Sequence, residues 1–214
     1  RNTFGMMYAS DKAPGNYSPD DREGYKHCQI RQIADPTVSC SVGRLLDENA
    51  DIGVLRVKRD VGSEHNIGMF ATTYNFVDRH NNTAGFDGRF RFNKKTVMDF
   101  QVLGTNTRGY FYNPFQDSTR YRTANGLGYR AYLERTDRNL YMNFLAQGRS
   151  NLYRTDVGFA SRYDTNSLSS FVQYQTDRDA KRSIIYKRIQ NNASITYDWK
   201  GRTQGLNTNT QGML

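Results

Sequence analysis

The stretch from Thr83 to Thr105 alternates apolar and polar side chains on both sides of a short break at residues 93–95. Successive side chains of a β-strand point to opposite faces, so this pattern predicts a β-hairpin with one apolar and one polar face. Phe86, Phe90 and Phe100 fall on the apolar face. A soluble antiparallel sheet gives the same alternation, with its polar side in water. In a soluble sheet the polar face meets bulk water, whereas in a membrane barrel it faces a lumen.

The composition favours one folded all-β domain spanning residues 1–214. Aromatic residues make up 13% of the chain, too many to remain in water along a disordered chain. The mean hydropathy is -0.83, and no apolar run approaches the roughly 18 residues that a membrane helix needs. Helical spans are therefore excluded, whereas the strands of a membrane barrel need be apolar only at every second position.

The chain carries a formal net charge of +9, which would suit a nucleic-acid binder. Its Arg and Lys residues are spread along the sequence, without a dense basic run or a recognisable binding module. A positive lumen, or a surface that meets anionic lipid, explains the excess equally well. We therefore expect no nucleic-acid partner.

The loop lengths give the strongest indication of topology. We expect ten strands, at residues 3–9, 51–60, 66–76, 83–92, 96–105, 126–135, 139–149, 154–163, 167–176 and 183–200. When the connections between these strands are numbered in chain order, every long connection has an odd number. The even-numbered connections are all tight turns. Outer-membrane barrels show this bias, whereas a β-sandwich has no reason to sort its loops in this way. Strands of about 10 residues, tilted by about 40°, would span about 25 Å of apolar membrane.

The prediction is an all-β, antiparallel, up-and-down transmembrane β-barrel, with about ten strands visible as part of a larger barrel. The chain opens on Arg1 without a signal peptide and ends without completing a strand pattern. We therefore expect it to be a segment of a longer polypeptide.

Residues 16–50 form a long polar loop insertion that holds both cysteines, Cys28 and Cys40. In an exported protein the simplest outcome is a disulfide between them. The alternative is a pair of free thiols in a reducing compartment. Their spacing is wrong for a zinc site, and His27 is a weak third ligand, so we predict no metal and no cofactor.

Several segments together resemble a known family: the outer-membrane β-barrel domain of unknown function that follows a family-nine-type carbohydrate-binding module in Gram-negative surface proteins. The matching segments cover 96 of the 214 residues and are fairly specific in combination. They are FGMMYASDKAPG at Phe4–Gly15, Ala50–Phe76, AGFDGRFRFN at Ala84–Asn93, Thr136–Ser167 and NNASITYDWKGRTQG at Asn191–Gly205.

The resemblance implies a bacterial outer-membrane location, a parent chain with an N-terminal carbohydrate-binding domain, and further strands after Leu214. The cysteine-bearing insertion departs from the family's pattern. The family has no established catalytic residues, so the resemblance supplies none.

The register of the predicted strands defines a set of polar residues that would face a lumen. They are Asp87, Arg89, Arg91, Asp99, Gln101, Arg130, Glu134, Asn139, Asn143 and Gln147. Two of them, Asp99 and Glu134, could in principle act as the acid and the base on a glycan. A ladder of opposite charges along a wet lumen is the simpler interpretation.

A long loop at residues 106–125 is rich in aromatic side chains, of which Tyr110, Tyr112, Phe115 and Tyr121 could stack on sugar rings. The competing interpretation is a girdle of aromatic residues at the membrane interface.

Three functional hypotheses follow. The first is an outer-membrane barrel that contacts lipid and binds, takes up or anchors glycan. The second is a soluble, secreted β-sandwich or lectin-like carbohydrate-binding module. The third is a polysaccharide-acting enzyme with its chemistry outside this chain, since no strong catalytic motif is visible.

Overall fold

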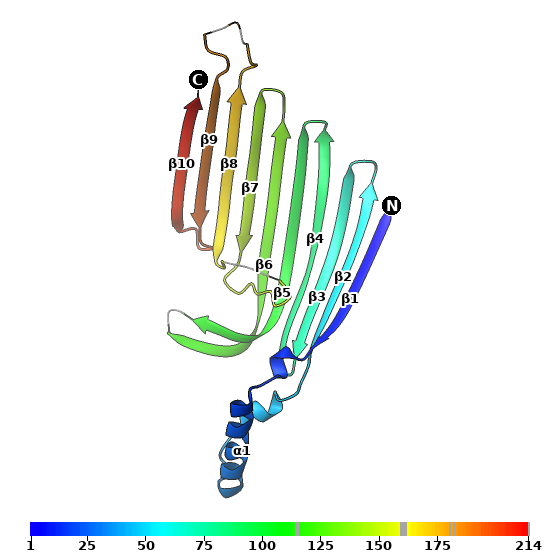
Figure 1. The fold of residues 1–214 in the computed structure, drawn as a ribbon, viewed down its shortest axis with the longest axis vertical. Coiled ribbons are helices and arrows are strands. Elements are labelled where there is room, and N and C mark those ends of the chain that lie inside the picture. Colours follow the sequence, from blue (N-terminus) through cyan, green and yellow to red (C-terminus); the bar gives the residue numbers. More distant parts are fainter. Residues whose placement is uncertain (114–115, 159–161, 180, 182, 214) are drawn as a thin grey trace.

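Ten antiparallel strands form one sheet in which the strand order follows the chain order (Figure 1). The computed structural model describes residues 1–113, 116–158, 162–179, 181 and 183–213. The all-β, up-and-down prediction is confirmed. The strands are β1 (Asn2–Asp11), β2 (Ala50–Val61), β3 (His65–Phe76), β4 (Arg79–Asn93), β5 (Thr96–Asn113), β6 (Ser118–Thr136), β7 (Leu140–Arg149), β8 (Thr165–Gln175), β9 (Arg188–Tyr197) and β10 (Thr203–Met213).

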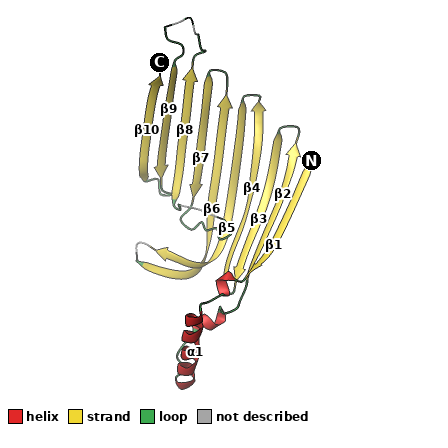
Figure 2. Cartoon of the chain, in the orientation of Figure 1, coloured by secondary structure: helices red, strands yellow, loops and turns green. Residues whose placement is uncertain are grey.

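The sheet is open. Among the described strands, β1 pairs only with β2 and β10 pairs only with β9, so these two are its edges. Figure 2 shows helix only in the insertion at one end, and no helix or second sheet covers either face within the described chain. Barrel closure and membrane insertion therefore stay predictions.

One face of the sheet is apolar across its width, and we call it the apolar face. Residues opposite each other on an antiparallel ladder share a face. One row of such pairs runs Phe4, Val57, Met69, Phe86, Val102 through β1 to β5. A second row runs Ala146, Leu168, Ile195, Leu206 through β7 to β10. Phe4, Phe86 and Leu206 are 67%, 60% and 75% exposed, so no described residue covers them.

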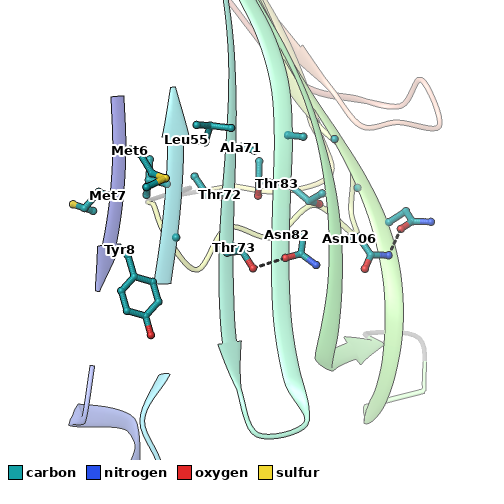
Figure 3. Close-up of a pocket in the computed structure, with 17 residues that line it drawn as sticks. Met6, Met7, Tyr8, Leu55, Ala71, Thr72, Thr73, Asn82, Thr83 and Asn106 are labelled. Carbon is teal, nitrogen blue, oxygen red and sulfur yellow. Dashed lines mark hydrogen bonds between the residues drawn. The ribbon is translucent and has the colours of Figure 1, made fainter. Parts of the chain in front are cut away.

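The apolar face ends toward the helical insertion at a row of polar side chains. Figure 3 shows two hydrogen bonds of this row, from Thr73 Oγ1 to Asn82 Oδ1 and from Asn106 Nδ2 to Asn125 Oδ1, each 2.7 Å long. On β4 the apolar side chains then continue from Ala84 to Phe92, about 26 Å along the strand at about 3.3 Å per residue. With strands tilted by about 40°, that band would be about 20 Å high.

Two strand predictions are wrong. One expected strand is absent from the described residues and one observed strand was missed, so the count of ten is unchanged. Of the expected strand at 154–163, the described residues 154–158 and 162–163 lie in no strand. This segment instead packs against the sheet through contacts that local sequence does not encode. Conversely, Thr203–Met213 is a strand, β10, that the sequence analysis missed. Its Asn and Gly residues have low strand propensity, and pairing with β9 overrides that preference.

The loop predictions need correction as well. The expected aromatic loop at 106–125 is the end of a long hairpin, because β5 and β6 stay paired as far as Asn113 and Ser118. The expected loop at 77–82 shrinks to residues 77–78, since β4 begins at Arg79. The connection between Gln175 of β8 and Arg188 of β9 is long although it joins strand ends on the side with the otherwise tight turns, so the sorting of loop lengths holds only in part.

The insertion between β1 and β2 contains a helix, α1 (Pro19–Ala34), and two short 3-10 turns, η1 (Ala13–Gly15) and η2 (Ser41–Arg44). Ser18 caps α1 by accepting a hydrogen bond from the Asp21 backbone N–H at 3.2 Å. Cys28 on α1 forms a disulfide with Cys40, as the sequence predicts. α1 has no buried residue, and no helix among the described residues is long and apolar enough to span a membrane.

Candidate functional site: the polar face of the sheet

The second face of the sheet, which we call the polar face, holds nine of the ten residues predicted to line a lumen. The register pairs Asp87 with Gln101, Gln101 with Arg130 and Arg130 with Gln147, so these four form one row. The neighbouring positions on the same face are Arg89, Arg91, Asp99, Glu134 and Asn143.

Asn139, the tenth residue, is not on the face of a strand. It lies in the turn before β7, where its Nδ2 donates to the carbonyl oxygen of Gln175 at 2.8 Å. Its role in the structure is to tie this turn to the end of β8.

The acidic groups on the polar face already have partners. Arg56 forms a double hydrogen bond with Asp87, and one of its two N–H···O contacts is 2.7 Å long. Arg89 lies 3.9 Å from Asp99, and Glu134 accepts a hydrogen bond from the Tyr132 hydroxyl at 2.9 Å. The carboxylates of Asp99 and Glu134 thus each face a separate partner.

Basic groups on this face outnumber those carboxylates. Within the described chain, neither Lys58 nor Arg130 forms an ion pair. Arg130 instead places its guanidinium 5.5 Å from the centre of the Tyr132 ring. The polar face therefore has a positive bias, in agreement with the basic composition of the chain.

The connection from β7 to β8 folds back onto the polar face; we call its described residues, 150–158 and 162–164, the inward loop. Asn81 of β4 is fully buried beneath it. The Asn81 amide donates to Thr107 Oγ1 at 2.7 Å and to the Arg154 carbonyl at 3.1 Å, and it accepts from the Asp156 backbone N–H at 3.1 Å. One side chain therefore fixes the loop to β4 and β5.

Two glycines of β6 make room for the inward loop. A Cβ atom at Gly126 would lie 2.3 Å from Cα of Tyr153, and one at Gly128 would lie 2.9 Å from the Tyr153 ring. Tyr153 is 4% exposed. The loop can approach β6 only because these two positions of the polar face have no side chain.

Arg154 is the centre of an aromatic cluster under the loop. Its guanidinium lies 5.0 Å from the ring centre of Phe111 and 4.5 Å from that of Tyr163. It also donates to the carbonyl oxygens of Asn151 and Tyr153 at 3.1 and 2.7 Å. Phe111, on the polar face of β5, is only 2% exposed as a result. The cluster fastens the inward loop to the long hairpin near the end of β5, where Phe111 is paired with Arg120.

The aromatic hairpin of β5 and β6 presents tyrosines to solvent. Tyr110 and Tyr112 are 61% and 58% exposed. Tyr121 packs edge-on against Tyr110 with ring centres 5.0 Å apart, and its hydroxyl donates to the Asp78 carbonyl at 2.6 Å. Phe115, also predicted as a stacking residue, lies outside the described residues. Exposed rings suit either glycan stacking or a membrane girdle, and both stay predictions.

Sequence reasoning missed the inward loop and its anchor. A signal was present in Gly126-Leu-Gly128, where two glycines two residues apart leave one face of a strand bare. Asn81 gave no such signal, because an Asn near a strand end is ordinary in any sheet. Nowhere in the described chain do three His, Cys, Asp or Glu side chains gather as metal ligands.

Comparison with protein-family models, curated proteins and solved structures finds no match for this chain. The family resemblance drawn from the sequence therefore stays a prediction.

Replacing Asn81 by Ala should release the inward loop. Three buried hydrogen bonds are lost, each worth about 1 kcal/mol, so the population of the undocked loop should rise on the order of a hundredfold. Trypsin would then cleave the full-length protein in detergent faster after Arg154 and Arg162. Asn82→Ala, one residue along on the opposite face, is the matched control. Equal cleavage rates in the two variants would contradict the anchoring role.

The docking of the loop should weaken as the pH rises. Burial raises the pKa of Asp156 above its usual value, although Arg154 and Arg79 oppose this shift. Because the folded pKa lies above the unfolded one, the docked state favours the protonated acid, and stability is lost as pH rises through the folded pKa. Asp156→Asn should thus slow hydrogen exchange in the loop relative to wild type at pH 8, and less so at pH 5. Equal protection at pH 8 would show that the carboxylate does not oppose docking.

Proposed function

We propose that this sheet is part of the wall of a β-barrel in the bacterial outer membrane, with the apolar face in lipid and the polar face along a water-filled passage. The observation that carries the proposal is the continuous apolar face, exposed across ten strands while the opposite face is charged. Soluble monomers rarely expose an apolar patch beyond a few hundred Å². Lipid is the partner that matches this face.

The dimensions of the apolar face support a membrane environment. Its height of about 20 Å approaches the apolar band of about 25 Å in outer-membrane barrels. The border row of Thr73, Asn82, Asn106 and Asn125 would then lie at the headgroup level. The hollow formed by Ala71, Ala84 and Gly104 beside that row would accept lipid acyl chains.

Closure of the sheet is a necessary part of this proposal. Unpaired backbone N–H and C=O groups of β1 and β10 would cost several kcal/mol each in hydrocarbon, so both edges must pair in the membrane. A soluble sandwich would instead require a second sheet over the apolar face, and the described strands all belong to one sheet.

We further propose that the barrel serves a carbohydrate-associated role: glycan binding, uptake or surface anchoring. The exposed Tyr110 and Tyr112 offer flat rings for sugar stacking, and the resemblance adds an N-terminal carbohydrate-binding domain in the same parent chain. An enzymatic parent protein would carry its chemistry outside these strands.

The full-length protein should be recovered in the outer-membrane fraction and should migrate differently on a gel before and after boiling. A closed barrel keeps its hydrogen-bonded wall in mild detergent, and heat unfolds it. Recovery in the soluble fraction, without a shift in migration, would rule out the barrel.

Cysteine labelling should distinguish the two faces at adjacent positions. Arg89→Cys, on the polar face, should react in whole cells or vesicles with a water-soluble maleimide that passes through the lumen. Phe90→Cys, one residue along, should react only with a lipid-soluble reagent. The reverse pattern would mean that the assignment of faces to lipid and water is wrong.

A further inference from the structure

A small polar cavity lies on the polar face where β7, β8 and β9 meet the inward loop. Its volume is about 160 Å³. Six side chains with polar groups line it: Gln147, Arg149, Arg162, Thr165, Ser167 and Thr196.

The sheet register builds most of this cavity. Arg149 of β7 is paired with Thr165 of β8, and Gln147 of β7 is paired with Ser167, which is paired in turn with Thr196 of β9. These five residues therefore share the polar face in two adjacent rows. Arg162 comes from the inward loop immediately before β8 and brings a second guanidinium to the same cavity.

The charge of the cavity is uncompensated. No carboxylate lines it, and among the described residues neither Arg149 nor Arg162 forms an ion pair. Elsewhere on the face, Arg56 and Arg89 each have an aspartate partner. Nor do the side chains of the six lining residues hydrogen-bond to any other described part of the protein. Two guanidinium groups, three hydroxyls and one amide are thus free to bind a ligand.

We propose that this cavity binds an oxyanion: a carboxylate, sulfate or phosphate group. Guanidinium groups form charge-assisted, often bidentate hydrogen bonds with such groups, and the hydroxyls of Thr165, Ser167 and Thr196 can donate to remaining oxygen lone pairs. The volume corresponds to about five waters at about 30 Å³ each. It suits a charged group and part of the ring that carries it.

The anion site follows from this chain's own residues, whereas the source of the anion rests on the proposed glycan role. Under that role the ligand is an acidic sugar whose carboxylate occupies the cavity. A free inorganic oxyanion has the same chemistry, so the experiment must separate the two sources.

The test is calorimetric titration of the full-length protein in detergent with sodium glucuronate, with glucose and with sodium sulfate. We expect glucuronate to bind and glucose not to bind. Arg149→Gln and Arg162→Gln should each weaken glucuronate binding by about tenfold or more, because each removes a charge-assisted contact. Lys58→Gln, the same charge change on the same face but at β2, should leave binding unchanged.

Binding of sulfate but not of glucuronate would support the anion site and would identify its ligand as a free inorganic anion. Equal binding of glucose and glucuronate, equal losses in the Lys58 variant, or no binding of either anion would overturn the proposal. Gel migration before and after boiling, measured on the same preparations, keeps the two conclusions apart. If the protein is heat-modifiable but binds no anion, only the proposed anion site is ruled out. If it binds the anion but shows no shift in migration, only the proposed barrel is ruled out.

Discussion

The structure depends on one uninterrupted antiparallel ladder. Because paired residues share a face, each strand fixes the orientation of the next, and the alternation in β4 and β5 extends to all ten strands. A slip of one residue at any pairing would turn the apolar side chains of the later strands toward the polar face. The strict register therefore keeps the apolar side chains on one face and the polar side chains on the other, in a sheet that is only one layer thick.

Several of the buried side chains lie on the face that a soluble sheet would expose. Phe111, Tyr153 and Asn81 are buried where the inward loop meets the polar face, while Phe4 and Leu206 remain open on the other. This distribution explains why the overall hydropathy is low in a protein with an apolar surface. The residues that would form a core in a soluble sheet are spread across the width of a single face. Close packing occurs where the inward loop meets the end of β5.

Sequence alone predicted the features that repeat locally. Period-two alternation identified nine of the ten strands and assigned nine polar side chains to one face, because alternation is a property of neighbouring residues. The Cys28–Cys40 pair was also predictable from its short separation. The sequence did not reveal β10, whose Asn-rich strand is stabilised by its partner, or the inward loop, whose Asn81 anchor is more than seventy residues away along the chain. The helix α1 was missed although Ser18 and Pro19 form a recognisable helix start.

The inward loop also has a mechanical consequence. It leaves the sheet at the end of β7 and returns to β8, yet between these points it is bonded to Asn81 on β4 and packed on Gly126 and Gly128 of β6. A hinge between β6 and β7, or a flattening of the sheet across β4 to β7, would stretch this strap. The inward loop thus links the two halves of the sheet and restrains hinging between them.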